Sequence, residues 1–68
     1  MISLKINGLE ERVAVSTITE LLAERGIDPK ARFLAVAVNG TVVRRAEWSG
    51  IALTAGDAVE IVRPFQGG

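Results

Sequence analysis

The sequence has 68 residues, 49% of them hydrophobic, which fits one small folded domain and argues against disorder. Eight basic and eight acidic residues give zero net charge, a composition that disfavours binding to nucleic acids or to membrane surfaces. Because the sequence has no cysteine and no histidine, it offers no disulfide, no thiolate or imidazole metal ligand and no imidazole base.

The N-terminal part of the chain predicts a β-hairpin. Its first residues, MISLKING, contain no apolar run long enough for a signal peptide or a membrane span, so a cytoplasmic location is expected. Residues 1–6 alternate apolar and polar side chains, as in a half-buried strand, and the alternation resumes in residues 12–15, RVAV. Asn7 and Gly8 are a turn signal, although the connection NGLEE is longer than the tightest two-residue turn.

The hydrophobic period then changes from that of a strand to that of a helix. Thr17 followed by Glu20 is a capping-box pattern, which predicts that the helix begins at Thr17. Three apolar residues fall on one helical face: Ile18, Leu21 and Leu22. Gly26 fits the position just after a helix and Pro29 prevents its continuation, so we expect a helix of roughly two to three turns.

A second hairpin is predicted after the helix. Residues 32–38, RFLAVAV, are apolar on both faces, as in a strand that is covered on at least one side. Asn39 and Gly40 are the strongest hairpin signal in the chain, because both residues tolerate a positive φ. Residues 41–45, TVVRR, are therefore predicted as the partner strand.

An irregular connection and a last strand complete the pattern. One helical turn is expected around residues 46–48, and a further turn at Gly56-Asp57. Trp48, the only tryptophan, is expected to close one end of the core with its indole N–H bonded outward. The segment AVEIVRPF alternates apolar and polar side chains as a strand does, until Pro64 ends it.

Two hairpins around one helix, with a closing strand, resemble the β-grasp fold of ubiquitin-like proteins. The segments ISLKING, TITELLAERG, AVAVNGTVVRRAEW and LTAGDAVEIV, with the final GG, resemble the ThiS family of sulfur carrier proteins of thiamine biosynthesis. The resemblance implies an α+β fold with a mixed sheet of four to five strands packed on one helix. It divides the chain into a β-grasp domain, residues 1–63, and a flexible diglycine tail, residues 64–68.

The resemblance also implies the chemistry of the tail. An α-carboxylate has an ordinary pKa of about 3.3–3.7, so at neutral pH that of Gly68 is ionised and a poor electrophile. In the family such a carboxylate is adenylated and converted to a thiocarboxylate, which donates sulfur for thiazole formation. Because the chain has no phosphate-cradling glycine loop and no metal ligands of its own, we expect it to bind no cofactor and to be no enzyme. The Mg-dependent ATP would then belong to an activating partner.

Further implied roles concern the tail and its partners. Gly67 and Gln66 are expected to thread into a partner active site, since glycine permits close backbone approach. Partner contacts are expected from three residues: Phe65, Pro64 and Arg63. The expected partners are an E1-like adenylyltransferase of the ThiF type, a thiazole synthase of the ThiG type, and a cysteine desulfurase or another sulfur source.

Alternatives stay open at this point. The same chemistry serves molybdopterin or cysteine synthesis and ubiquitin-like conjugation, and a β-grasp interaction module with an inert tail is a different class of function. Phe65 either anchors the tail on the partner or packs on the edge of its own domain. Arg44, Arg45 and Arg63 either meet an acidic patch on a partner or lie on solvated strand faces.

Overall fold

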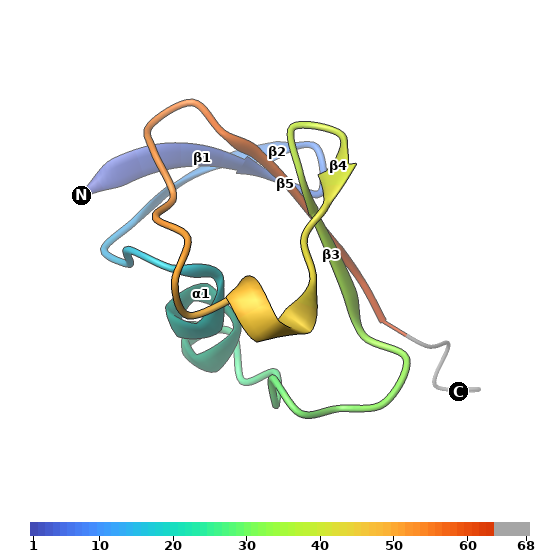
Figure 1. Cartoon of the computed structure of the whole chain (residues 1–68). Coiled ribbons are helices and arrows are strands. Elements are labelled where there is room, and N and C mark those ends of the chain that lie inside the picture. The colour runs from blue at the N-terminus through green and yellow to red at the C-terminus, as the bar shows by residue number, and fades with distance from the viewer. Residues whose placement is uncertain (64–68) are drawn as a thin grey trace, which may run out of the picture.

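The computed structural model describes residues 1–63, which form a five-stranded mixed sheet with a helix on one face (Figure 1). The elements follow in the order β1 (Ile2–Ile6), β2 (Leu9–Val13), α1 (Ile18–Glu24), β3 (Ala35–Val38), β4 (Thr41–Val42), the 3₁₀ turn η1 (Arg45–Glu47) and β5 (Ala58–Val62). The strand order is β2-β1-β5-β3-β4, in which β1 and β5 are parallel and the other neighbours antiparallel. This arrangement confirms the predicted α+β class and the mixed sheet packed on one helix.

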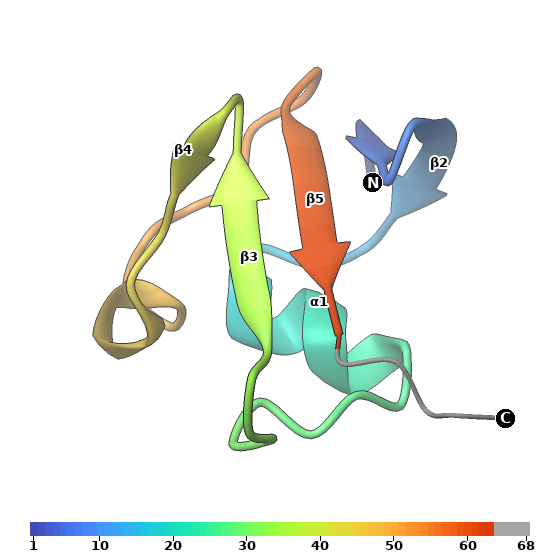
Figure 2. The same cartoon turned by 90° about the vertical axis from the view of Figure 1, so that its right-hand side faces the viewer.

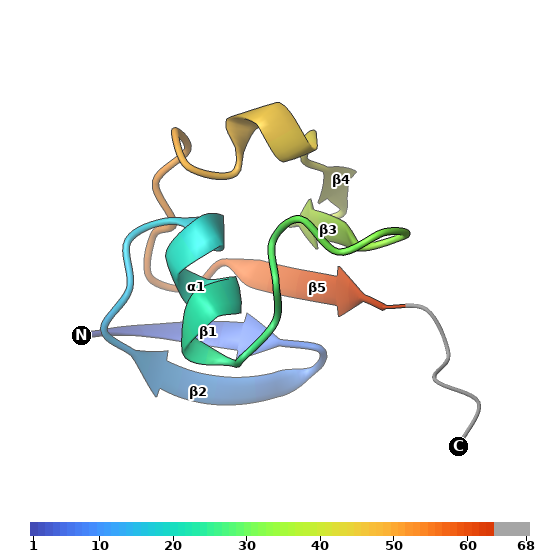
Figure 3. The same ribbon diagram turned by 90° about the horizontal axis from the view of Figure 1, so that it is seen from below.

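The core lies between the sheet and α1, which crosses one face of β1 and β5 (Figure 3). Alternate strand residues and one stripe of the helix point into it, as the two periods require. Six large side chains are completely buried: Leu4, Ile18, Leu21, Leu22, Val36 and Val59. Trp48 follows η1 and is only 3% exposed, and its indole N–H donates to the Val43 carbonyl over 2.8 Å. The prediction that Trp48 closes the core is confirmed.

The limits of α1 follow from its end residues. The Thr17 hydroxyl accepts a hydrogen bond from the Glu20 N–H (3.2 Å), so Thr17 caps the helix as predicted. The Glu20 carboxylate accepts from the N–H of Ser16 (2.7 Å), one residue before the cap. At the other end Gly26 has φ +74 and its N–H donates to the Ala23 carbonyl, which ends the helix. With seven residues α1 is short, and no helix within residues 1–63 is long and apolar enough to cross a membrane.

The first hairpin is tighter than the sequence predicted. Asn7 and Gly8 both have positive φ, +49 and +86, and they alone connect Ile6 to its cross-strand partner Leu9. The second strand therefore begins at Leu9 rather than at residue 12, and the predicted longer connection is wrong. A two-residue turn of this kind matches the twist of the flanking strands, which is why it is favoured.

The other strands are shorter than the sequence predicted. The strand after the helix begins at Ala35, because Phe33 has φ +62 and breaks the extended backbone. Its partner strand ends at Val42 instead of Arg45. The chain then turns into η1, and the residue after η1, Trp48, packs in the core. The last strand ends at Val62.

Candidate functional site

The structure describes one of the six predicted site residues, Arg63, which is exposed and follows the end of β5. The other five lie outside the described residues: Pro64, Phe65, Gln66, Gly67 and Gly68. What the structure defines is thus the base from which these residues continue. That base consists of the end of β5 and the surfaces next to it.

β5 is the central strand of the sheet. It pairs in parallel with β1 through Ala58 and Val59, and antiparallel with β3 over four residue pairs, the last of which joins Val62 to Ala35. Its inward side chains, Val59 and Ile61, are 0% and 9% exposed. β5 is therefore paired with β1 at its start and with β3 along its length, and its last residue, Val62, pairs with β3 alone.

Two asparagine side chains extend the hydrogen bonding of β5. The Asn7 Oδ1 accepts from the Ile61 N–H (2.8 Å), where β1 has already turned away from β5. The Asn39 Oδ1 accepts from the Ala58 N–H (2.9 Å), at the first residue of the strand. From the sequence, both asparagines were predicted only as turn residues. The N–H groups that they accept from lie 54 and 19 positions away in the chain, so no local pattern indicates these hydrogen bonds.

A carboxylate joins the network at the start of β5. Asp57 accepts from the Thr54 N–H (2.9 Å) and from the Asn39 side-chain amide (2.9 Å). The Thr54 N–H is the main reason that the pKa of Asp57 lies below its ordinary value of 3.8. Burial raises this pKa by less, and the side chains of Asn39 and Thr54 lower it further. Since every contact of this carboxylate belongs to a turn, we assign it a structural role.

The sheet face opposite α1 is open, and its two halves differ. On the β1–β2 half the outward residues are polar: Ser3, Lys5, Glu10 and Arg12. On the β3–β5 half they are mostly apolar: Ala35, Ala37, Val42, Ala58 and Val62, with Glu60 among them. Figure 2 shows β3, β4 and β5 from this side, with α1 behind them. Val42 is 71% and Val62 60% exposed, so this apolar half-face is a candidate surface for contact with a partner.

The loop between α1 and β3 carries another large exposed side chain. Phe33 is 79% exposed and has a left-handed backbone, which costs a residue with a Cβ roughly 1–2 kcal/mol. The next residue, Leu34, is buried in the core. The sequence placed Phe33 inside a strand and gave no sign of either feature.

Arg45 ties this loop to η1. Its guanidinium donates to the carbonyls of Pro29, Ala31 and Leu34, over 2.8 Å to Ala31 and 3.5 Å to Leu34. The same guanidinium lies 4.7 Å from the centre of the Trp48 ring. The predicted strand-face position of Arg45 is wrong, because Arg45 lies in η1. Its contact with a partner stays a prediction.

The described residues offer little chemistry of their own. No group of three or more acidic side chains within residues 1–63 is placed to hold a metal ion, and that part of the chain has no pocket. What this arrangement provides is a strand end that pairs with β3, beside an apolar half-face. Such a base can present a following segment to another protein.

The comparisons with known proteins agree with this geometry. The family profile described as the ThiS family matches residues 4–68. The crystal structure of thiamine biosynthesis protein ThiS from Geobacter metallireducens is 33% identical, with a TM-score of 0.79 over 98% of this chain and 100% of that one. The solution structure of a thiamine biosynthesis protein from the same organism is 33% identical, with a TM-score of 0.80 over 98% and 88% of the two chains. None of the curated proteins matches the sequence.

Proposed function

The chain belongs to the ThiS family, and we propose that it is a sulfur carrier of thiamine biosynthesis whose reactive group is the carboxylate of Gly68. The observation that carries the proposal is the family match, which extends through residue 68. Both solved relatives are thiamine biosynthesis proteins, which favours thiazole formation over molybdopterin synthesis, cysteine synthesis or protein conjugation.

The proposed chemistry has two steps, the first at a carboxylate oxygen of Gly68 and the second at its carbonyl carbon. The Gly68 carboxylate attacks the α-phosphate of ATP and releases pyrophosphate, which turns one carboxylate oxygen into part of an AMP leaving group. Hydrosulfide then attacks the carbonyl carbon, displaces AMP and leaves a thiocarboxylate after loss of a proton. If a persulfide attacks instead, the product is an acyl disulfide, which a thiol reduces to the thiocarboxylate. Activation is needed because a free carboxylate repels nucleophiles and offers only oxide as a leaving group.

In the proposed scheme, partner proteins bind the ATP, provide the sulfur and accept it from the carrier. A ThiF-type adenylyltransferase would bind the Mg-dependent ATP, a cysteine desulfurase or another source would provide sulfur, and a ThiG-type thiazole synthase would receive it. In this scheme Gly67 and Gln66 thread into the partner active site, and Arg63, Pro64 and Phe65 contact its entrance. The chain itself acts as carrier and not as catalyst.

The described fold supports a carrier in two ways. The central position of β5 gives the tail a fixed origin, so little ordering of the domain is needed when a partner binds. The apolar half-face lies beside that origin, where a docking partner can cover Val42 and Val62. Both features fit a domain that a partner binds while it modifies the tail.

Mass spectrometry of the intact protein tests the proposal. The chain is incubated with the ThiF-type enzyme of the same genome, ATP, Mg²⁺ and a sulfur source. We expect a species heavier by the difference between one sulfur and one oxygen atom. A chain with one alanine added after Gly68 is the control: it should keep the same melting temperature and gain no sulfur. Sulfur incorporation into the extended chain, or none into the natural one, would overturn the proposal.

A further inference from the structure

Phe33 has two features that are each unfavourable for a phenylalanine. Its side chain is 79% exposed, so burial contributes little to its stability. Its φ of +62 is a conformation that glycine or asparagine adopts far more readily. Residues held in such conformations without compensating burial concentrate at functional sites. The folded domain by itself thus gives no reason for an aromatic ring at this position.

The backbone that presents the ring is held in place. The guanidinium of Arg45 donates to three carbonyls of the loop, and it stacks on the buried Trp48. On the other side of Phe33, Leu34 is buried in the core. Because the loop is already fixed, a partner that binds the ring has little backbone entropy to remove, which favours affinity.

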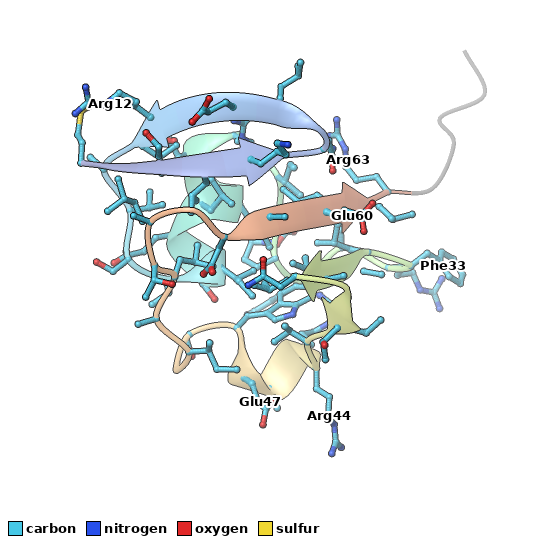
Figure 4. All side chains as sticks on the ribbon, turned by 90° about the horizontal axis from the view of Figure 1, so that it is seen from above. Arg12, Phe33, Arg44, Glu47, Glu60 and Arg63 are labelled. Carbon is cyan, nitrogen blue, oxygen red and sulfur yellow. The ribbon has the colours of Figure 1, made fainter. Side chains whose placement is uncertain are left out.

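The ring lies at the end of the sheet where β5 finishes. Ala35 pairs with Val62, so the residues just before Ala35 and just after Val62 emerge side by side. Phe33 is two positions before Ala35, and Arg63 is the residue after Val62. Figure 4 shows Phe33 and Arg63 at the same end of the molecule, with Arg12 at the opposite end.

Basic side chains outnumber acidic ones around the ring, where the acids are Asp28 in the loop and Glu60 on β5 (Figure 4). Three basic residues, which we call the basic rim, lie in the loop or directly after β5: Lys30, Arg32 and Arg63. Within residues 1–63 the only ion pair joins Arg25 to Glu11, so no described acid neutralises the basic rim by direct contact. A second copy of the chain would bring the same positive rim to this surface, and like charges would oppose the pairing. An acidic surface is the complementary one.

We propose that Phe33 is a docking residue for the enzyme that activates the tail. Its ring enters an apolar pocket beside the entrance that receives residues 64–68, and the basic rim faces acidic side chains around that entrance. The inference rests on the proposed function and names a contact of it that is separate from the apolar half-face. Phe33 acts in binding, and it does not touch the reacting carboxylate.

Replacing Phe33 by glycine separates docking from folding. Phe33→Gly removes the ring and relieves the left-handed backbone, so the melting temperature should stay the same or rise. In ATP–pyrophosphate exchange with the ThiF-type enzyme of the same genome, the KM for the carrier should rise about thirtyfold, as for an aromatic interface hot spot, while kcat changes much less. Phe33→Asn, which also tolerates a positive φ, should reproduce both results.

Ile51→Ala is the matched control for the loss of an exposed apolar side chain. Ile51 is 39% exposed. Its neighbour Ala52 forms a β-bridge with Thr17, a few residues after the end of β2, and β2 ends beside the first residue of β1. Ile51 therefore lies away from the end of β5. Its KM should equal that of the natural chain. For the charges, Arg32→Glu should raise the KM at low salt and lose this effect at high salt, whereas Arg12→Glu at the far end should not.

Each outcome decides the inference. An unchanged KM for both Phe33 variants, with normal activation of the natural chain, overturns the inference and leaves the proposed function intact. No pyrophosphate exchange with the natural chain overturns both. A lower melting temperature for both variants would make Phe33 a structural residue, and a dimer of the natural chain that Phe33→Gly dissociates would assign the ring to self-association. Either result also overturns the inference.

Discussion

Two Asn-Gly turns flank β5, and their backbones are nearly the same. Asn7 and Gly8 have φ +49 and +86, and Asn39 and Gly40 have φ +52 and +84. In both turns the asparagine side chain accepts a hydrogen bond from an N–H of β5. One dipeptide thus performs the same two tasks on each side of the central strand: it reverses a hairpin and it supports β5.

The two turns differ in what else they hold. Both asparagine N–H groups donate to β5, that of Asn39 to the Ala58 carbonyl (2.7 Å) and that of Asn7 to the Val59 carbonyl (2.9 Å). Only Asn39, at the start of β5, also donates its side-chain amide to a carboxylate, that of Asp57. Asn7 supports the end of β5 with one neutral side-chain bond, to Ile61. The end from which the predicted tail continues is therefore held more weakly than the start. Local opening is expected to begin there.

The largest loss of stability should come from Asn39→Ala. Alanine would be strained at φ +52, and both the Ala58 N–H and the Asp57 carboxylate would lose a partner. We expect the free energy of unfolding to fall by about 3 kcal/mol, measured by urea denaturation. A loss below that of the equivalent Asn7 variant would reverse the ranking of the two ends.

Asn7→Ala should cost less. The same backbone strain arises at φ +49, but only the hydrogen bond to Ile61 disappears. The expected loss is about 2 kcal/mol, from the same urea experiment. If the variant is as stable as the natural chain, the side chain of Asn7 does not support β5 in solution.

Asn7→Gly isolates the side-chain bond, because glycine accepts the positive φ. We expect a loss of about 1 kcal/mol and roughly fivefold faster amide hydrogen exchange at Ile61, both from the missing acceptor. Exchange at Ala58, which Asn39 supports, is the internal control and should not change. Equal acceleration at both amides would mean that β5 opens as one unit.

The smallest effect should be on the pH dependence of the free energy of unfolding, through the carboxylate of Asp57 just before β5. The pKa of Asp57 is lowered in the folded state, so its contribution to stability is complete above 3.8 and is lost as the pH falls through the lower folded value. Asp57→Asn should therefore flatten the acid side of the stability curve, measured as the urea midpoint against pH. Parallel curves for variant and natural chain would show that the carboxylate is not held.

The elements of the fold were largely predictable, because each has a local cause. Three predicted features depend only on residues a few positions apart: the alternation in residues 1–6, the Thr17 cap and the position of Gly26. The structure confirms all three. Strand ends were less predictable. Residues 33–38 form an apolar run, which carries no information on φ and so gave no sign of the break at Phe33.

The candidate site was predictable only in part. Composition, pattern and the resemblance to a family were enough to propose the tail and its carboxylate, and the comparisons confirm the family. Nothing local in the sequence indicated the support of Ile61 by Asn7, the loop contacts of Arg45 or the exposure of Phe33. Each was found only in the folded chain.

The sequence by itself determined the order of strands and helix, the turns and the caps, since these depend on periods and backbone preferences over a few residues. Only the tertiary structure decided which side chains hold β5 and which stand exposed beside its end. The physical reason is distance along the chain: Asn7 meets Ile61 across 54 positions, and Arg45 reaches back 14 to Ala31. Such contacts exist only after the sheet has formed, when residues far apart in the sequence lie on one surface.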